Sequence, residues 1–149
     1  MEKKLQKSFT DTGLGFPITL LNVTMVKVRG KWTPKIDYNI LTRTVLMALS
    51  EKSVRLTGNE VRFIRHHHEM TLEQFASRFG VTHAAVIKWE KTHDEPTKMS
   101  WAIEKDLRLF VQFTVLGKPA KLAELYSELE KEKSSQKRNI KLDIKNFAA

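Results

Sequence analysis

The stretch from Thr71 to Lys91, TLEQFASRFGVTHAAVIKWEK, limits the fold of this chain more than any other segment. Ala76, Gly80 and Val86 have the spacing of two short helices joined by a tight turn. Ala76 is small enough for the second helix to cross closely, Gly80 can take the positive φ that ends the first helix, and Val86 fills the space between them. The spacing therefore predicts a helix-turn-helix motif.

Further helices are expected on both sides of this motif. Thr57 precedes Glu60, and Thr71 precedes Gln74, by the three residues of a capping box, in which side chains satisfy free backbone donors at a helix start. Three other segments repeat apolar residues at helical spacing, namely about 37–51, 99–116 and 120–133. The sequence therefore predicts a helix-turn-helix domain of about five helices, followed by a C-terminal helix.

The N-terminal segment is expected to add only a small β element. Residues 1–12 are polar and rich in lysine, and glycine and proline follow them, which indicates a flexible or extended arm. Residues 18–28 are dense in β-branched side chains and predict one strand. Residues 32–36 can return beside it as an edge strand, because Pro34 lacks a backbone donor. The expected fold class is therefore mainly α with a small N-terminal β-hairpin.

The basic C-terminal tail leaves two interpretations open. Ile140, Leu142 and Ile144 alternate with polar residues, so this stretch either pairs as a strand or stays disordered. The expected division of the chain is an N-terminal arm, β element and helix (1–54), a helix-turn-helix domain (55–117), and a C-terminal helix with a basic tail (118–149).

Composition narrows the classes of partner. The formal net charge of +9 favours a polyanionic partner, although a solvated basic surface has the same charge balance. The chain has no cysteine, which excludes disulfides, thiolate zinc sites and thiol nucleophiles. It also has no apolar run long enough to span a membrane and no apolar signal-peptide stretch, so we expect a cytoplasmic protein that does not associate with membranes.

The sequence shows no pattern typical of an enzyme. It has no glycine-rich phosphate loop, no informative pair of carboxylates and no serine nucleophile elbow. His66, His67 and His68 are neighbours on an expected helix, and consecutive helical side chains point about 100° apart, so they cannot converge on one ion. We therefore expect no catalytic residues, no metal site and no cofactor.

The motif resembles the Cro and phage-repressor class of helix-turn-helix domains, also called XRE-like, over about residues 57–92. The resemblance implies a structural ion pair between Arg65, late in the helix before the motif, and Glu90, after the recognition helix. It also implies that DNA is contacted from the second motif helix, by the residues Thr82, His83, Ala84 and Lys88, with Lys91 near the DNA backbone.

One position departs from that class. The family often has glutamine where Leu72 stands, which removes a DNA contact from the start of the first motif helix. Thr71 and Gln74 flank this position, and we expect them to supply the contact instead.

A second resemblance covers more of the chain, from about Gly13 to Val111. The segment LTGNEVRFIR, Leu56 to Arg65, is similar to the junction that precedes the helix-turn-helix in MqsA-type antitoxins. Those proteins carry a small N-terminal zinc module, but here Arg29 to Trp32 stands where a cysteine pair is expected. The resemblance therefore implies an antitoxin or regulator whose N-terminal module lacks zinc.

Together these features predict a sequence-specific DNA-binding transcriptional regulator. It is expected to bind a palindromic operator in double-stranded DNA as a homodimer, because one small module alone rarely discriminates enough. It is either a free-standing repressor or an autoregulating antitoxin that also binds a toxin protein. The alternative is a protein-binding module that uses the helix-turn-helix scaffold without recognising DNA.

Overall fold

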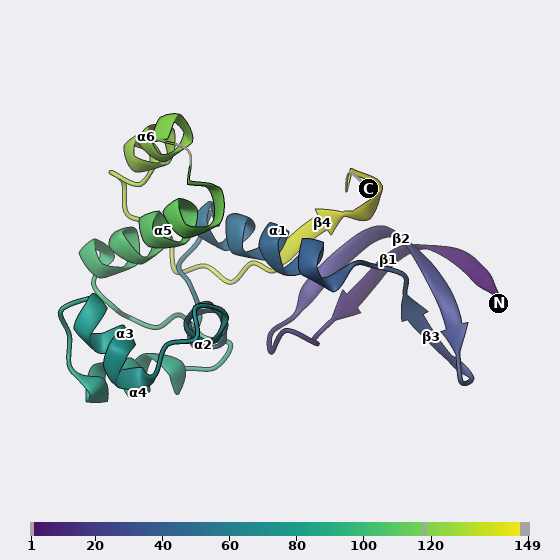
Figure 1. Ribbon diagram of the computed structural model, residues 1–149, viewed down its shortest axis with the longest axis horizontal. Coiled ribbons are helices and arrows are strands. Elements are labelled where there is room, and N and C mark those ends of the chain that lie inside the picture. The colour runs from purple at the N-terminus through teal and green to yellow at the C-terminus, as the bar shows by residue number, and fades with distance from the viewer. Residues whose placement is uncertain (1, 118, 147–149) are drawn as a thin grey trace. The chain divides into compact units, whose positions relative to one another are not determined.

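The computed structural model describes residues 2–117 and 119–146 (Figure 1). In chain order the elements are β1 (Lys3–Asp11), β2 (Ile18–Val28), β3 (Lys31–Pro34), α1 (Tyr38–Ser50), α2 (Gly58–His67), α3 (Leu72–Arg78), α4 (His83–Glu90), α5 (Trp101–Leu116), α6 (Pro119–Glu128), β4 (Ile140–Asp143) and the short 3-10 helix η1 (Ile144–Asn146). They form two compact units. The β unit comprises residues up to Thr42 and from Asn139 onward, and the helical unit runs from Arg43 to Arg138.

The expectation of a mainly α fold with only a small β-hairpin is wrong. The β unit contains a four-stranded mixed sheet with β2 at its centre. β2 pairs antiparallel with β1 from Lys3↔Val26 to Asp11↔Ile18. On its other side β2 pairs antiparallel with β3 and parallel with β4, which is the yellow strand of Figure 1.

Two of the four strands come from segments expected to be an arm and a tail. β1 reads KKLQKSFTD and has little β-forming character of its own, so its strand conformation comes from backbone pairing with β2 between Ile18 and Val26. β4 is short, and the parallel ladder from Ile18↔Ile140 to Leu21↔Asp143 fixes it. The chain therefore returns to its N-terminal sheet after the helical unit, which differs from the expected grouping of 118–149 as one separate segment.

Asn22 shifts the alternation of buried side chains along β2. Ile18 and Leu20 are buried before it, whereas Val23 and Met25 are buried after it. Asn22 itself has a φ of 54°, the left-handed conformation that asparagine tolerates better than most residues. Its side-chain amide donates to both carboxylate oxygens of Asp143 at 3.0 Å, so this irregular position also ties β4 to the sheet.

The helical unit begins its helices where the sequence predicts. Both capping boxes form: Thr57 with Glu60 starts α2, and Thr71 with Gln74 starts α3. Ser100 caps α5 by accepting a hydrogen bond from the amide of Ile103. The apolar core of this unit includes Ile64, Phe75, Val86, Leu107 and Val111, all fully or almost fully buried. Within the described residues, no helix is long and apolar enough to cross a membrane.

A buried polar network fixes the connector between α1 and α2. The guanidinium of Arg108 is fully buried and donates to the carbonyl oxygens of Lys52 and Val54, each at 2.6 Å. It also pairs with Glu104, one turn earlier on α5, at 2.8 Å. Burial lowers the pKa of Arg108, and the negative charge of Glu104 opposes that shift. Because the connector carbonyls have this cation as their donor, α2 starts at a fixed place relative to α5.

Candidate nucleic-acid interface

The turn between α3 and α4 has the geometry that the sequence pattern predicts. Gly80 has a φ of 67°, and the amide of Val81 donates to the carbonyl of Ala76 at 3.0 Å, which closes the end of α3. Thr82 then caps α4, because its hydroxyl accepts from the amide of Ala85 at 3.1 Å. Ala76 and Val86 are both buried between the helices. α3 and α4 therefore form one packed pair (Figure 1).

The structure brings Arg65 and Glu90 together. Nε of Arg65 donates to one carboxylate oxygen of Glu90 at 2.7 Å, and a terminal nitrogen donates to the other oxygen at 2.9 Å. The remaining nitrogen donates to the carbonyl of Met70 at 3.0 Å. Both side chains are about one-tenth exposed. One guanidinium thus holds the end of α4, the end of α2 and the loop before α3 in a fixed arrangement.

The seven residues expected to contact DNA all lie on the surface. They are Thr71, Gln74, Thr82, His83, Ala84, Lys88 and Lys91, and we call them the α3–α4 surface. Lys88 lies one turn after Ala84 on α4, so the two side chains share a face of that helix. Within the described part of the chain, neither Lys88 nor Lys91 forms an ion pair. Their charges are therefore available to an external anion.

The amino end of α4 also presents unused donors. The first hydrogen bonds of the helix come from the amides of Ala85 and Val86 to the carbonyl of Thr82. The amides of His83 and Ala84 precede these and have no partner among the described residues. Free amides at a helix start, together with the helix dipole, favour a phosphate group.

Thr71 and Gln74 have a structural role that leaves part of each side chain free. The hydroxyl of Thr71 accepts from the amide of Gln74, and the side-chain oxygen of Gln74 accepts from the amide of Thr71. The capping box thus uses acceptor atoms only. The hydroxyl hydrogen of Thr71 and the side-chain NH₂ of Gln74 remain as donors.

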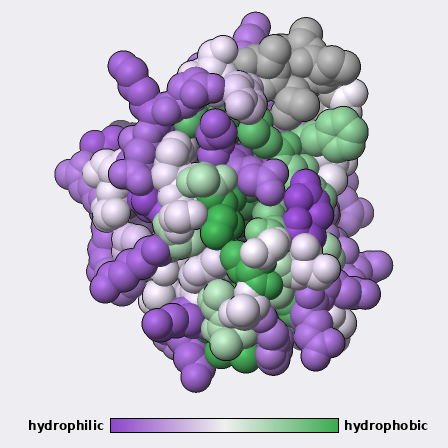
Figure 2. Space-filling view, turned by 90° about the vertical axis from the view of Figure 1, so that its left-hand side faces the viewer, coloured by the Kyte–Doolittle hydropathy of each residue, from purple (hydrophilic) through white to green (hydrophobic). Residues whose placement is uncertain are grey.

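Figure 2 looks onto the end of the helical unit that lies at the left of Figure 1. Hydrophilic residues cover most of this face, and a band of apolar residues crosses it. Of the larger apolar side chains in this unit, Phe113 is 61% exposed and Tyr126 is 47% exposed. The unit therefore offers apolar as well as charged surface to a partner.

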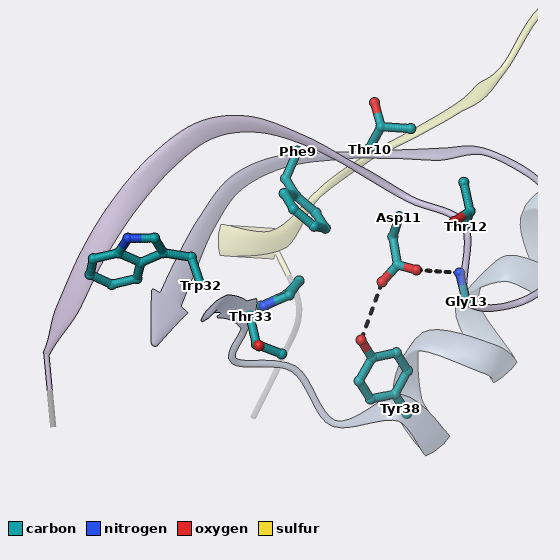
Figure 3. A pocket seen from close by; sticks show the side chains of 9 residues that line it. Phe9, Thr10, Asp11, Thr12, Gly13, Trp32, Thr33 and Tyr38 are labelled. Carbon is teal, nitrogen blue, oxygen red and sulfur yellow. Dashed lines mark hydrogen bonds between the residues drawn. The ribbon is translucent and has the colours of Figure 1, made fainter. Parts of the chain in front are cut away.

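The β unit holds a second candidate site that the sequence analysis missed. An open pocket of about 280 Å³ is lined by Phe9, Thr10, Asp11, Thr12, Gly13, Trp32, Thr33, Pro34 and Tyr38 (Figure 3). The hydroxyl of Tyr38 donates to one oxygen of Asp11 at 3.2 Å, and the amide of Gly13 donates to the other at 2.6 Å. Burial raises the pKa of Tyr38 above 10.0, and the charge and hydrogen bond of Asp11 raise it further.

A sequence signal for this pocket does exist. Lysines cluster in residues 3–7, which lie in β1, and in residues 27–35, which span the end of β2 and β3, and Trp32 lies within the second cluster. A flexible or extended arm over residues 1–12 would keep these clusters apart, whereas the pairing of β1 with β2 brings them into one sheet.

The three adjacent histidines do not converge. His68 contacts the carbonyl of Ile64 and the hydroxyl of Thr114, while His66 lies against Arg65. Among the described residues, no three His, Cys, Asp or Glu side chains are grouped to hold a metal ion.

Comparison with known proteins found no match: no family model matches the chain, and no curated protein or solved structure shows significant similarity to it. The site must therefore be interpreted from its own residues.

Proposed function

We propose that this chain is a sequence-specific transcriptional regulator that places α4 in the major groove of double-stranded DNA. The observation that supports this most directly is the α3–α4 surface, where Lys88 and Lys91 are exposed and without an ion pair beside free backbone amides. The Arg65–Glu90 pair holds α4 rigidly, so these groups are already positioned for a ligand. A rigid helix with such a surface matches the docking of a recognition helix.

The side chains on α4 suit distinct roles in reading DNA. Lys88 can donate to O6 or N7 of guanine, and His83 can donate to or accept from a base edge. Ala84 suits contact with the methyl group of thymine. Thr82 and the free amides behind it suit a phosphate, as does Lys91 at the other end of the helix.

We propose that the active form is a homodimer that represses by occupying a palindromic operator in the cytoplasm. Two helix-turn-helix units related by a twofold axis read half-sites about 34 Å apart. The exposed Phe113 and Tyr126 supply apolar surface that a second copy can cover. The similarity of Leu56–Arg65 to MqsA-type antitoxins favours an autoregulating antitoxin over a free-standing repressor.

The decisive experiment is selection of bound sequences from a library of random duplexes. We expect the wild-type chain to enrich a palindrome and Lys88→Ala to lose selection at one position of each half-site, at a cost of about 1–3 kcal/mol. Lys131→Ala is the matched control, because it removes one exposed positive charge outside the α3–α4 surface. It should enrich the same palindrome as the wild type.

Two outcomes would overturn the proposal. If the wild-type chain enriches no sequence at low salt, the α3–α4 surface does not read DNA, and the helix-turn-helix scaffold serves to dock a protein. If Lys88→Ala enriches the same palindrome with the same affinity as the wild type, α4 is not the helix that contacts bases.

A further inference from the structure

The β unit carries a concentration of positive charge that the DNA-binding proposal does not use. It contains nine basic side chains, which are Lys3, Lys4, Lys7, Lys27, Arg29, Lys31, Lys35, Lys141 and Lys145. Against them stand four acidic side chains, so the net charge of the unit is +5. All four acids already have intramolecular partners. Asp11 accepts from Tyr38, Asp37 accepts from the start of α1, and Asp143 accepts from Asn22. Glu2 pairs with Lys27 at 3.8 Å, and both side chains of this pair are exposed.

Two of these lysines converge on one aromatic ring. Nζ of Lys4 lies 4.4 Å from the centre of the Trp32 ring, and Nζ of Lys27 lies 5.9 Å from it. The strand register explains this, because Lys27 is paired directly with Trp32 and Lys4 is paired with Met25, two residues away. The exposed Glu2 offsets the charge of Lys27 only weakly, since it lies 3.8 Å away in contact with solvent. The two ammonium groups beside the ring therefore keep a net positive charge, and a further anion there would be stabilised.

The pocket beside Trp32 combines aromatic surface with one carboxylate. Figure 3 shows Trp32 at one side, Tyr38 at the other and Phe9 between them. Asp11 is only 8% exposed, and each of its oxygens accepts one hydrogen bond. Each oxygen keeps a second lone pair, so Asp11 can still accept from a ligand. The volume of about 280 Å³ is near the lower limit for small-molecule sites and suits one flat ring system.

We propose that this pocket binds one unpaired nucleotide. The base lies against the aromatic side chains and donates an amino N–H to Asp11, and the phosphate pairs with Lys4 and Lys27. Stacking on aromatic side chains beside a basic groove is the general way in which proteins hold unpaired bases. In a duplex the same amino group is paired, so the ligand is a single strand or a free nucleotide.

The charge pattern separates this ligand from the other classes. An acidic peptide would satisfy Lys4 and Lys27, but its carboxylates would be repelled by Asp11. A cationic ligand would satisfy Asp11 and be repelled by the two lysines. A nucleotide carries an anion at one end and N–H donors on a flat apolar group at the other, which matches the two lysines beside Trp32 and Asp11 in the pocket.

The test uses the full chain and a fluorescently labelled oligodeoxycytidine of about ten nucleotides, a length within the range that one small single-strand-binding domain covers. Anisotropy at low salt gives the affinity. We expect the double variant Lys4→Ala/Lys27→Ala to bind at least about tenfold more weakly than the wild type. Trp32→Ala should lose about fivefold or more, and Trp32→Phe should restore part of that loss.

The matched control is Lys141→Ala/Lys145→Ala, which removes the same charge from the same unit at β4 and η1. It should change the affinity by less than about threefold, the extent of a general charge effect. Circular dichroism of each variant verifies that the sheet is retained. Competition with cytidine monophosphate distinguishes the two forms of the ligand. If micromolar cytidine monophosphate displaces the labelled oligomer, the pocket binds a free nucleotide; if only unlabelled oligomer displaces it, the pocket binds a single strand.

Three results would overturn the proposal. The first is absence of wild-type binding to either the oligomer or the mononucleotide. The second is an equal loss in the control and in Lys4→Ala/Lys27→Ala, which would mean attraction to the whole basic unit without a site. The third is displacement of the oligomer by polyglutamate at matched charge, which would mean that the lysines hold an acidic protein segment.

Discussion

Gly58 and Trp89 contact each other through their main chains: a Cβ atom on Gly58 would lie 2.5 Å from the carbonyl oxygen of Trp89. It would also lie 2.8 Å from the carbonyl oxygen of Glu90, and real Cβ atoms essentially never come closer than 3.0 Å to such atoms. The first turn of α2 is therefore pressed against the last turn of α4. This close approach helps to fix the orientation of α4, and it requires glycine at this position.

Gly58→Ala should destabilise the helical unit by about 2–3 kcal/mol, because the added methyl group meets backbone that cannot move aside cheaply. Gly80→Ala is the comparison: nothing lies within 4 Å of a Cβ there, so only its φ of 67° opposes the change, at about 1 kcal/mol. Urea unfolding of both variants measures the difference. Equal losses would show that α2 and α4 are not in such close contact.

Arg65→Ala should cost up to about 3 kcal/mol of folding stability, because it leaves Glu90 as a nearly buried charge without its partner. The carbonyl of Met70 also loses its donor. Arg65→Lys keeps the charge but cannot make both hydrogen bonds to the carboxylate, so an intermediate loss is expected. The melting temperature of the two variants tests this order, and a wild-type value for Arg65→Ala would refute the structural role of the pair.

The pKa of Tyr38 should lie above the ordinary tyrosine value of 10.0, because burial, and then the charge and hydrogen bond of Asp11, raise it. The variant Tyr126→Phe leaves Tyr38 as the only tyrosine, so its ultraviolet absorbance change reports that group alone. Asp11→Asn in the same background should lower the midpoint of the Tyr38 titration. The substitution removes the nearby negative charge and leaves only a weaker acceptor for the hydroxyl of the neutral phenol. Burial, the larger cause, remains, so the midpoint should stay above 10.0.

The raised pKa of Tyr38 also has a consequence for stability. Since the folded-state pKa lies above the unfolded value, the stabilisation is fully present below pH 10.0 and is lost as the pH rises through the folded-state pKa. Denaturation at increasing alkaline pH should therefore show a smaller loss of stability for Tyr38→Phe than for the wild type. If the unfolding free energy of Tyr38→Phe and of the wild type fell equally with rising pH, the raised pKa of Tyr38 would be contradicted.

Lys91→Ala should weaken DNA binding about equally on all sequences and reduce the salt dependence by about one unit in the slope of log K against log salt. This follows from its position near the end of α4, where it is exposed and suited to a phosphate. Lys131→Ala should leave the slope unchanged. A loss of sequence preference in Lys91→Ala would instead assign this residue to a base edge.

The helix-turn-helix segment could be predicted because its determinants are local. The capping boxes at Thr57 and Thr71 are set by residues three positions apart, and the turn at Gly80 depends on a single left-handed residue. The surface positions of α4 follow from the same periodicity that buries Val86. Local rules therefore identify both this motif and its exposed side chains.

Only part of the sheet could be predicted. The β-branched residues of β2 and the edge position of β3 are indicated locally, whereas β1 and the joining of β4 to the sheet depend on distant partners. β1 has three lysines and an exposed Leu5, and only its partner β2 makes it a strand. β4 depends on a partner far along the chain, and the left-handed Asn22 shifts the alternation in the middle of β2. The pocket at Asp11 and Tyr38 exists only once these strands are paired, so apart from the lysine clusters near Trp32 the sequence gives no local signal for it.

The pairing of β4 with β2 sets an order of events for the folding chain. Ile18 and Ile140 must meet across the whole helical unit, and bringing together the ends of so long an open loop is entropically costly. In the folded helical unit, however, a guanidinium nitrogen of Arg138 donates to the hydroxyl of Ser53 at 3.4 Å. Once the helical unit has folded, Ser53 and Arg138 are held together, so the loop that β4 must close is shorter and its closure costs about 1 kcal/mol less. We therefore expect the helical unit to form first and the last strand to join the sheet afterwards.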